Sequence, residues 1–330
     1  MNYLYIILGI LLLSFLSYCF WKWKNRVILI THSGDYHLDE VFSTAVLTLK
    51  LKKEGKFYQL IRTRDENIFE KWRKAREEKN REVYIYDVGK KYDLGKNEFD
   101  HHQIGGAGRR ENGIEYSSAG LIWKHFGNEF GLTERGWENI DKNFVSAIDA
   151  VDNGQEICKM NFEIESFNLI DLIKLFTPKK RTDKGMQKAF WKSVKLVQFI
   201  LERKIKREEK IEKDILKLQE VYASTEDKQF LVIEDEKVNT NLITELFPDV
   251  LFALKKQSDD VWYLQTIRVK KGEFLRRKYL PESWAGLEGE ALDKITKIKG
   301  GIFCHRAKFL ASAKTKEAGI AMIKIALEEK

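Results

Sequence analysis

The chain has 330 residues, of which 43% are hydrophobic and 12% aromatic, a composition that is typical of a globular protein and excludes an intrinsically disordered chain. Its formal net charge of +8 favours a polyanionic partner, either nucleic acid or an anionic lipid surface, although its basic runs at 179–181 and 203–207 also suit a solvated helix face. The three cysteines, Cys19, Cys158 and Cys304, share no regular spacing, so neither a disulfide partner nor a cysteine-based zinc site is expected.

The N-terminal segment 3–21 carries no charged residue. At about 1.5 Å per residue, a helix of this length matches a hydrocarbon core about 30 Å thick. The segment lacks the basic start and the small-residue cleavage site of a secretory signal, so a transmembrane anchor at 1–24 is predicted, with a cleaved signal or a buried core helix as alternatives. Because Lys22, Lys24 and Arg26 follow, we expect a single-pass membrane protein whose globular body lies in the cytoplasm.

The next part of the chain alternates between apolar strands and helices. Strands are predicted at 26–30, 57–62 and 83–86, and helices at 39–51, 68–79, 117–126 and 134–151. This alternation is typical of an α/β domain with a parallel sheet, which we expect at 25–160. Ligands of such sheets gather beyond the carboxyl ends of the strands, so His32 and Asp87, which follow two of these strands, are expected to share one crevice.

The second half of the chain has a different pattern. Residues 156–182 are irregular, and a long charged helix without proline follows at 183–222, so 161–224 is predicted to be a helical connector. A smaller α+β domain is expected at 225–330. Its predicted strands are 230–233, 250–254, 262–269 and 302–304, and its predicted last helix is 314–327.

Histidine is scarce in this chain, with six residues, and four of the five in the first half stand beside aspartates. Divalent metals that activate water need neutral imidazoles and carboxylates that converge from several elements. The adjacent pair His101 and His102 can divide the work, one facing the metal and the other a substrate phosphate. The residues that this pattern brings together are His32, His37, Asp39, Asp87, Asp100, His101, His102 and Asp152.

Each of these motifs is weak when taken singly, because an isolated His-x-Asp more often caps a helix or completes a core. Their joint occurrence at predicted strand and helix ends favours a metal centre. The chain has no GxSxG elbow and no P-loop, and the glycines at 105–108 lack the strand that precedes a dinucleotide-binding loop. His125 stands on an apolar helix between Trp123 and Phe126 and is expected to pack rather than to bind metal.

The chain resembles the DHH phosphoesterase superfamily, and more closely its branch known as the metal-dependent protein hydrolase or melanocyte-proliferating-gene (Myg) exonuclease family. The eukaryotic members of this branch are regarded as 3′-5′ RNA exonucleases. The resemblance is carried by THSG at 31–34, HLDE at 37–40, DVG at 87–89, DHHQ at 100–103, YSSAGLIWKHFG at 116–127, AIDAVDNG at 147–154, LPESWAGL at 280–287 and FCH at 303–305.

The resemblance implies a role for each of these residues and a DHH-like fold for 25–160. It implies that the metal ligands are His32, His37, Asp39, Asp87, His101 and Asp152. The metal would be Mn²⁺ or Mg²⁺, with two ions bound. His102 would bind or protonate the substrate phosphate. Asp149 would support the ligands, although Asp149 and Asp152 can exchange these roles because they lie near the same helix end. Ser117 and Ser118 would either cap the following helix or bind phosphate.

The resemblance also implies that the C-terminal domain binds substrate, through His305, for which packing is the alternative. Lys308 and Lys314 are basic residues near the presumed cleft, and they are expected to bind substrate as well. The chain departs from the branch here, since FLASAKT stands at 309–315 in place of a glycine-rich stretch. Alanine and serine limit how closely a phosphate approaches the backbone, so this departure concerns the substrate and leaves the metal site intact.

The expected activity is that of a divalent-metal-dependent phosphoesterase. The resemblance points to a 3′-5′ exonuclease on RNA or short oligonucleotides that hydrolyses phosphodiesters with a metal-bridging hydroxide. A membrane-anchored phosphodiesterase for cyclic or small dinucleotides is the first alternative, suggested by the anchor, and a non-catalytic nucleic-acid-binding module is the second. The oligomeric state is left open.

Overall fold

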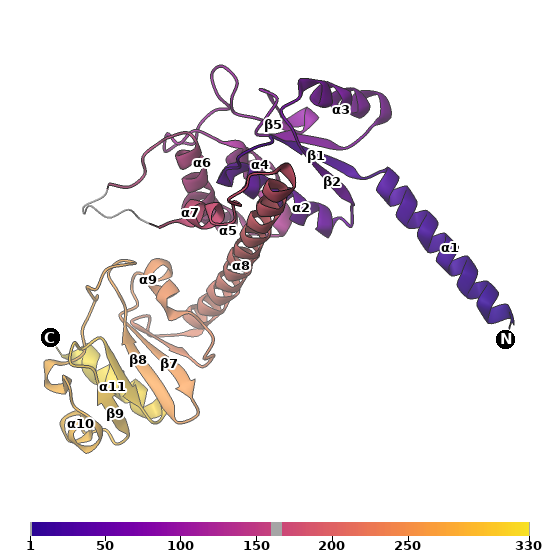
Figure 1. The fold of residues 1–330 in the computed structure, drawn as a ribbon. Helices are drawn as coiled ribbons and strands as arrows, with labels where there is room; N and C mark the ends of the chain where they lie inside the picture. Colours follow the sequence, from indigo (N-terminus) through magenta and orange to yellow (C-terminus); the bar gives the residue numbers. More distant parts are fainter. Residues whose placement is uncertain (1, 160–166, 330) are drawn as a thin grey trace. The chain divides into compact units, whose positions relative to one another are not determined.

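The computed structural model describes residues 2–159 and 167–329. The chain divides into two compact units, Met1–Glu209 and Lys210–Lys330, and helix α8 (Asp183–Ser224) contributes residues to both. Each unit contains a mixed five-stranded sheet with helices, so the predicted α/β class is confirmed (Figure 1). The predicted division at 24, 160 and 224 stays a prediction, and the boundary at 160 lies outside the described residues.

Helix α1 (Asn2–Lys24) is long and apolar enough to cross a membrane, by length and composition. None of the residues in its window Ile7–Lys24 is buried. The helix ends against the rest of the first unit, where Lys22 Nζ donates to the Gly55 carbonyl at 2.5 Å and Arg81 Nη1 donates to the Lys24 carbonyl at 2.6 Å.

The sheet of the first unit has the order β2-β1-β3-β5-β4. Its strands are β1 (Val27–Thr31), β2 (Tyr58–Arg62), β3 (Val83–Tyr86), β4 (Tyr92–Asp93) and β5 (Glu98–Phe99). Strand β1 pairs in parallel with β2 and β3, and β3 pairs in parallel with β5, whereas the edge strand β4 is antiparallel to β5. The three predicted strands are present; the two-residue strands β4 and β5 were not predicted.

Alternating side chains of this sheet face two layers of helices. Ile28 and Ile85 belong to a small core with Phe69 of α3 (Glu66–Lys79), whereas Leu29 and Tyr86 belong to the large core on the opposite face. That face is covered by α2 (Leu38–Lys53) and α4 (Ser118–Phe126), on the opposite side of the sheet from α3 (Figure 1). The remaining helical segments are η1 (Leu94–Lys96), η2 (Gly127–Phe130), α5 (Glu134–Ile140), the π-helix Asp141–Val145, α6 (Ser146–Asp152) and α7 (Leu169–Lys174).

The sheet of the second unit has the order β6-β7-β8-β10-β9, and its one parallel pair is β6 with β7. Its strands are β6 (Phe230–Ile233), β7 (Phe252–Ser258), β8 (Val261–Thr266), β9 (Gly301–Cys304) and β10 (Leu310–Ala313). Helix α11 (Lys316–Glu328) packs on one face. The end of α8 and helix α9 (Ile243–Leu246) contribute to the core on the other, and η4 (Thr240–Leu242), η5 (Glu282–Trp284) and α10 (Gly289–Thr296) complete the unit.

Strand β10 was not predicted from the sequence. It lies within the stretch FLASAKT at 309–315, whose residues Leu310–Ala313 form a strand between β8 and β9. Side chains such as Ala311 and Ala313 are buried in the core of this unit. The backbone of Leu310–Ala313 is therefore paired on both sides and packed in the core.

Candidate metal centre

Three adjacent parallel strands of the first unit end at the same edge of the sheet, and each is followed by a residue that can bind metal. His32 follows β1, Asp87 follows β3, and the segment 100–102 follows β5. Asp87 has a left-handed backbone, with φ of 53°, which turns the chain sharply after β3. Aspartate tolerates this conformation better than most residues, and such local strain is typical of functional sites.

His32 lies between two carboxylates at this edge. Its Nε2 atom is 3.0 Å from Asp87 Oδ2 and 3.1 Å from Glu40 Oε1, and the side chain is 3% exposed. Glu40 stands in the first turn of α2, where its carboxylate accepts hydrogen bonds from the His37 backbone N–H at 2.9 and 2.8 Å. The start of α2 thus brings its acidic residues to the ends of β1 and β3.

His101 joins Asp87 to the end of helix α6. Its Nε2 atom is 3.1 Å from Asp152 Oδ2 and 3.7 Å from Asp87 Oδ1. The other ring nitrogen, Nδ1, lies 3.1 Å from Asn153 Oδ1. An amide oxygen at this place accepts a hydrogen bond from Nδ1–H, which keeps the proton on Nδ1 and leaves Nε2 free to bind a metal.

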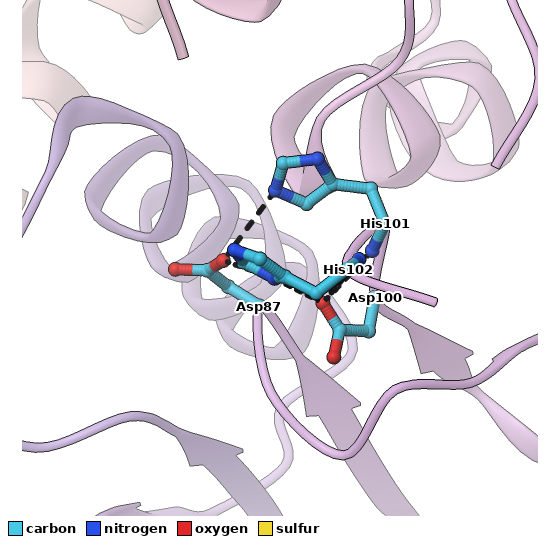
Figure 2. Close-up of side chains that lie close together, drawn as sticks. All are labelled: Asp87, Asp100, His101 and His102. Atoms are coloured by element: carbon cyan, nitrogen blue, oxygen red, sulfur yellow. Dashed lines mark hydrogen bonds and ion pairs between the residues drawn. The ribbon is translucent and has the colours of Figure 1, made fainter. Parts of the chain in front are cut away.

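Asp100 positions the side chain of His102. Its Oδ1 atom accepts from His102 Nδ1 at 2.7 Å, and its Oδ2 atom accepts from the Lys90 backbone N–H at 2.6 Å. Figure 2 shows the side chains of Asp87, Asp100, His101 and His102 converging. The His102 side chain is 55% exposed, whereas that of His101 is 7% exposed. The two neighbouring histidines therefore face different surroundings.

Asp39 gives the clearest indication that this site can bind a cation. Both of its carboxylate oxygens are buried, and neither has a hydrogen-bond partner in the described part of the chain. Asp39 can share one ion with His37 and Asp152, or with Glu40 and Asp87, because one ligand atom from each residue of either set lies within 4.8 Å of the others. Buried charges are ordinarily paired or bound to a metal, so these residues fit a divalent cation.

The charges of the site shift its pKa values in opposite directions. Burial, together with the charges of Asp87 and Asp152, raises the pKa of Asp39 well above its usual range. Burial opposes ionisation of Asp87 as well, but hydrogen bonds to His101 and His32 outweigh it and lower the pKa of Asp87 to about 2. Burial likewise opposes protonation of the two histidines, but their carboxylate neighbours raise the pKa of each to about 10. The raised pKa values of Asp39, His32 and His101 show that this site favours added positive charge, which a cation can supply.

The structure separates the two aspartates that the sequence left interchangeable. Asp152 reaches His101, whereas the buried Asp149 accepts from Ser117 Oγ at 2.6 Å and from the Gly120 N–H at 2.9 Å, and pairs with Arg110. Burial raises the pKa of Asp149 despite the adjacent guanidinium. Asp149 therefore fixes the start of α4 and belongs to none of the candidate metal groups among the described residues.

Both serines at the start of α4 are buried, with their hydroxyls occupied. Ser117 is the N-cap residue, whose Oγ accepts from the Ala119 N–H at 3.2 Å, and Ser118 Oγ donates to the Phe99 carbonyl at 2.7 Å. This geometry supports the capping interpretation. His125 packs beside Phe99 and hydrogen-bonds to the Tyr92 hydroxyl through Nε2 at 2.7 Å, as expected for a packed residue.

The three predicted substrate-binding residues of the C-terminal half lie in the second unit, near β9 and β10. His305 follows β9, where its Nδ1 atom accepts from the Ala307 N–H at 3.0 Å and its ring packs on Phe309. Lys308 has a φ of 57° and pairs with Glu282. Lys314 is exposed at the end of β10. Their predicted role stays a prediction.

Sequence reasoning missed three residues that the structure places at the metal centre. Glu40 touches His32, Asn153 touches His101, and Arg64 places Nη2 3.0 Å from His32 Nδ1. Glu40 and Asn153 directly follow predicted ligands, which is a usable signal. Arg64 comes from the segment after β2, and nothing in its local sequence marks it.

The comparison with protein families decides the kinship of the chain. The family model MYG1_exonuc, described as Uncharacterised protein family (UPF0160), matches residues 28–327. The chain belongs to this family. Membership confirms both the predicted kinship and the predicted enzyme class, a metal-dependent nuclease among the hydrolases.

Curated relatives match over nearly their whole length. The MYG1 protein of Dictyostelium discoideum is 26% identical over 326 residues, which cover 90% of this chain and 95% of the relative. The MYG1 exonuclease of Homo sapiens is 25% identical over 336 residues, covering 91% and 85%.

Solved structures give weaker overlaps. A crystal structure of the exonuclease RecJ bound to manganese is 12% identical and covers 93% of this chain and 91% of that chain at a TM-score of 0.28. The structure of RecJ from Thermus thermophilus in complex with Mn²⁺ covers 93% of this chain and 53% of that chain at 0.27, with the same identity. Scores this low establish no shared fold, so the kinship rests on the family model.

Proposed function

We propose that this protein is a divalent-metal-dependent 3′-5′ exonuclease, which hydrolyses phosphodiesters of RNA or short oligonucleotides at the edge of the first sheet. The observation that carries the proposal is the buried Asp39 carboxylate, which has no hydrogen-bond partner in the described part of the chain and lies among residues that can bind metal. The family membership supplies the enzyme class. The DHH-like character of the first unit and the choice of RNA are parts of this proposal.

The proposed ligands are His32, His37, Asp39, Asp87, His101 and Asp152, and Glu40 stands beside them. This mixed set of imidazole nitrogens and carboxylate oxygens suits Mn²⁺ better than Mg²⁺, which prefers oxygen ligands and keeps several waters. When bound, one or two such cations lower the pKa of a water molecule and offset the negative charge that builds on the phosphate oxygens.

His102 is the proposed contact to the substrate phosphate. Its Nδ1 atom is held by Asp100, and this hydrogen bond is the main reason why the pKa of His102 is raised. Since Nδ1 is occupied and the side chain is half-exposed, Nε2 is the atom that can meet a ligand. A protonated His102 donates Nε2–H to a phosphate oxygen and supplies a proton to the leaving oxygen.

Arg64 is the proposed second contact to the phosphate. It is exposed, and its guanidinium touches the Ser33 carbonyl at 3.3 Å and His32 Nδ1 at 3.0 Å. When His32 Nε2 binds metal, Nδ1 carries the proton and donates to the Ser33 carbonyl, 3.2 Å away. With Nδ1 protonated, the ring offers Arg64 no acceptor, which leaves its Nη2 donors free for a phosphate.

The second unit and helix α1 complete the proposal. His305, Lys308 and Lys314 are proposed to contact the substrate through the second unit. Helix α1 is proposed to anchor the chain in a membrane with the catalytic body in the cytoplasm. This apolar helix also favours a second candidate substrate, a cyclic or small dinucleotide.

The test uses the full-length chain in detergent, with a 5′-labelled RNA ladder and with cyclic dinucleotides, in Mn²⁺ or Mg²⁺. We expect metal-dependent shortening of the RNA from its 3′ end. Both Asp39→Asn and His101→Ala are expected to reduce the rate by about 100-fold or more, because each removes a metal ligand. Asp35→Asn is the matched control, since Asp35 is exposed and pairs with Arg181 at the surface.

Each result has a defined meaning. Unchanged turnover in Asp39→Asn overturns the metal-site assignment. Faster hydrolysis of the cyclic dinucleotide than of RNA replaces the nuclease with the dinucleotide phosphodiesterase. Binding of RNA without metal-stimulated cleavage in the wild-type protein supports a non-catalytic module.

A further inference from the structure

The second unit contains a small polar pocket at the end of β8 that no step of the proposed chemistry uses. Its volume is about 200 Å³. It lies where β8 ends and the chain enters β10, and its lining includes Thr240, Asn241, Gln265, Arg268, Arg276 and Phe309. None of the residues that line it is acidic.

Arg268 is the unusual residue of this pocket. Its Nε atom is buried without a hydrogen-bond partner, and its side chain forms no hydrogen bond or ion pair within residues 2–159 and 167–329. An arginine offers five N–H donors in a fixed fork, and leaving a buried donor such as Nε–H unpaired costs free energy. A ligand that accepts hydrogen bonds would satisfy them.

Arg276 places a second guanidinium in the same pocket. Its backbone forms an antiparallel bridge with that of Arg268, and its Nη1 atom donates to the Thr266 carbonyl at 3.0 Å. Its guanidinium lies 5.2 Å from the centre of the Phe309 ring. Burial and the charge of Arg268 lower the pKa of Arg276, as expected for two like charges without a counter-ion.

The chemistry of the pocket selects a phosphate. Two arginines in one polar cavity form the arrangement that binds phosphate through paired N–H donors. Thr240 and Asn241 supply neutral polar groups at its rim. The volume lies below the about 300–1,000 Å³ of pockets that enclose a whole drug-sized ligand, so it suits one phosphate with its attached sugar.

We infer that the pocket around Arg268 and Arg276 binds a phosphate group of a nucleotide, either free or within an oligonucleotide strand. The choice of a nucleotide over other phosphate compounds rests on the proposed nuclease function. The pocket gives the second unit a phosphate site built from side chains. Backbone approach at 311–313 is not needed for it, because that stretch pairs within the sheet as part of β10.

The test measures binding to the full-length chain in detergent by calorimetry, with a chelator present so that no RNA is cleaved. The probes are adenosine, adenosine 5′-monophosphate, inorganic phosphate and a six-nucleotide RNA. We expect the monophosphate to bind and adenosine not to bind. Arg268→Gln is expected to weaken the monophosphate at least about tenfold, the scale of a lost hydrogen bond to a charged group. Lys270→Gln, which removes one exposed positive charge two residues away, is expected to change the affinity for the monophosphate by less than about twofold.

Arg268→Gln is the informative variant, because the Arg268 side chain forms no hydrogen bond to any other described residue. Its replacement removes no hydrogen bond that stabilises the fold, so the thermal unfolding of the variant should match that of the wild-type protein. Equal binding of adenosine and its monophosphate, or unchanged binding in Arg268→Gln, overturns the inference. Tighter binding of the RNA than of the monophosphate supports a phosphate within a strand, and tighter binding of the monophosphate than of the RNA supports a free nucleotide. Equal binding of inorganic phosphate and monophosphate overturns the choice of a nucleotide.

The outcome is separable from that of the proposed nuclease. Asp39→Asn is expected to lose cleavage in the presence of metal and to keep monophosphate binding in the chelator. If the wild-type protein binds the monophosphate but cleaves no RNA, the pocket stands and the nuclease proposal fails. If the wild-type protein cleaves RNA but binds no phosphate probe, the nuclease proposal stands and the pocket inference fails.

Discussion

The negative charge of the buried Asp39 carboxylate needs a cation or a proton to offset it. A buried carboxylate near three other carboxylates cannot stay ionised without compensation, since desolvation and like charges both oppose it. Without a bound cation, protons on His32 and His101, whose pKa values are raised to about 10, offset part of this charge. Because only neutral imidazole binds a metal, the cation must displace the protons of both histidines.

Metal affinity is therefore expected to rise with pH. The pKa of both His32 and His101 is about 10 in the fold and about 6.5 when unfolded, so their protonation stabilises the metal-free fold fully below pH 6.5. This stabilisation is lost as the pH rises toward 10, while proton competition with the metal weakens. We expect the Kd for Mn²⁺ to fall at least about tenfold per pH unit between pH 6 and 8, with proton release. Calorimetry in two buffers of different ionisation enthalpy measures the Kd and the number of protons released. A pH-independent Kd would contradict the displacement of protons by the metal.

The sequence could predict the identity of most candidate residues at this scale, but not their mutual arrangement. Asp149 and Asp152 are three positions apart on one helix, so they share a face and spacing cannot rank them. The structure ranks them through partners far along the chain, Arg110 for one and His101 for the other. Arg64 was invisible for the same reason, because its contact to His32 comes only from the pairing of β2 with β1.

At the scale of elements, the start of α4 is built around one buried carboxylate. Asp149 accepts hydrogen bonds from the backbone of Ser117 and Gly120, and it needs close approach. A Cβ atom on Gly120 would stand 2.0 Å from Asp149 Oδ2. Position 120 therefore requires glycine, because an added methyl group would push the Asp149 carboxylate away from the start of α4.

Gly120→Ala is expected to destabilise the first unit by about 2–3 kcal/mol, as overpacking and loss of buried hydrogen bonds combine. This corresponds to a fall of roughly 4–12 °C in Tm for a unit of this size. Calorimetric unfolding of the full chain measures it. Gly95→Ala is the control, since its nearest contact is an ordinary 3.4 Å to Asp93. Equal Tm values for the two variants would show that α4 tolerates the shift.

Elements with a clear apolar period were predictable, and those fixed by tertiary pairing were not. The buried β1 and β3 and the long α8 follow their sequence patterns. Strand β5 has two residues, too few for any pattern, yet it carries the 100–102 segment. The helix predicted at 134–151 is interrupted by a π-helix at Asp141–Val145, and such interruptions leave no reliable trace in sequence periodicity.

At the scale of the whole molecule, α1 stands apart from the chemistry. Among the described residues, none of α1 belongs to the candidate metal groups, and its side chains in Ile7–Lys24 are unburied. An unburied apolar helix in water would expose a large apolar patch, which soluble proteins avoid. Its contacts to the first unit lie at its last turn, where Lys22 and Lys24 stand at the basic end.

Helix α1 is therefore expected to govern location and to leave the chemistry unchanged. The full chain should stay with membranes after alkaline carbonate extraction, whereas residues 25–330 should be released and keep metal-dependent RNA hydrolysis. If the basic flank holds the body in the cytoplasm, as proposed, added protease should digest the body in inside-out vesicles and spare it in right-side-out ones. The intact mass of the full chain is the control: a product shortened at the N-terminus would identify a cleaved signal. Carbonate release of an intact full chain would contradict the anchor, since an inserted helix is not extracted by charge or pH.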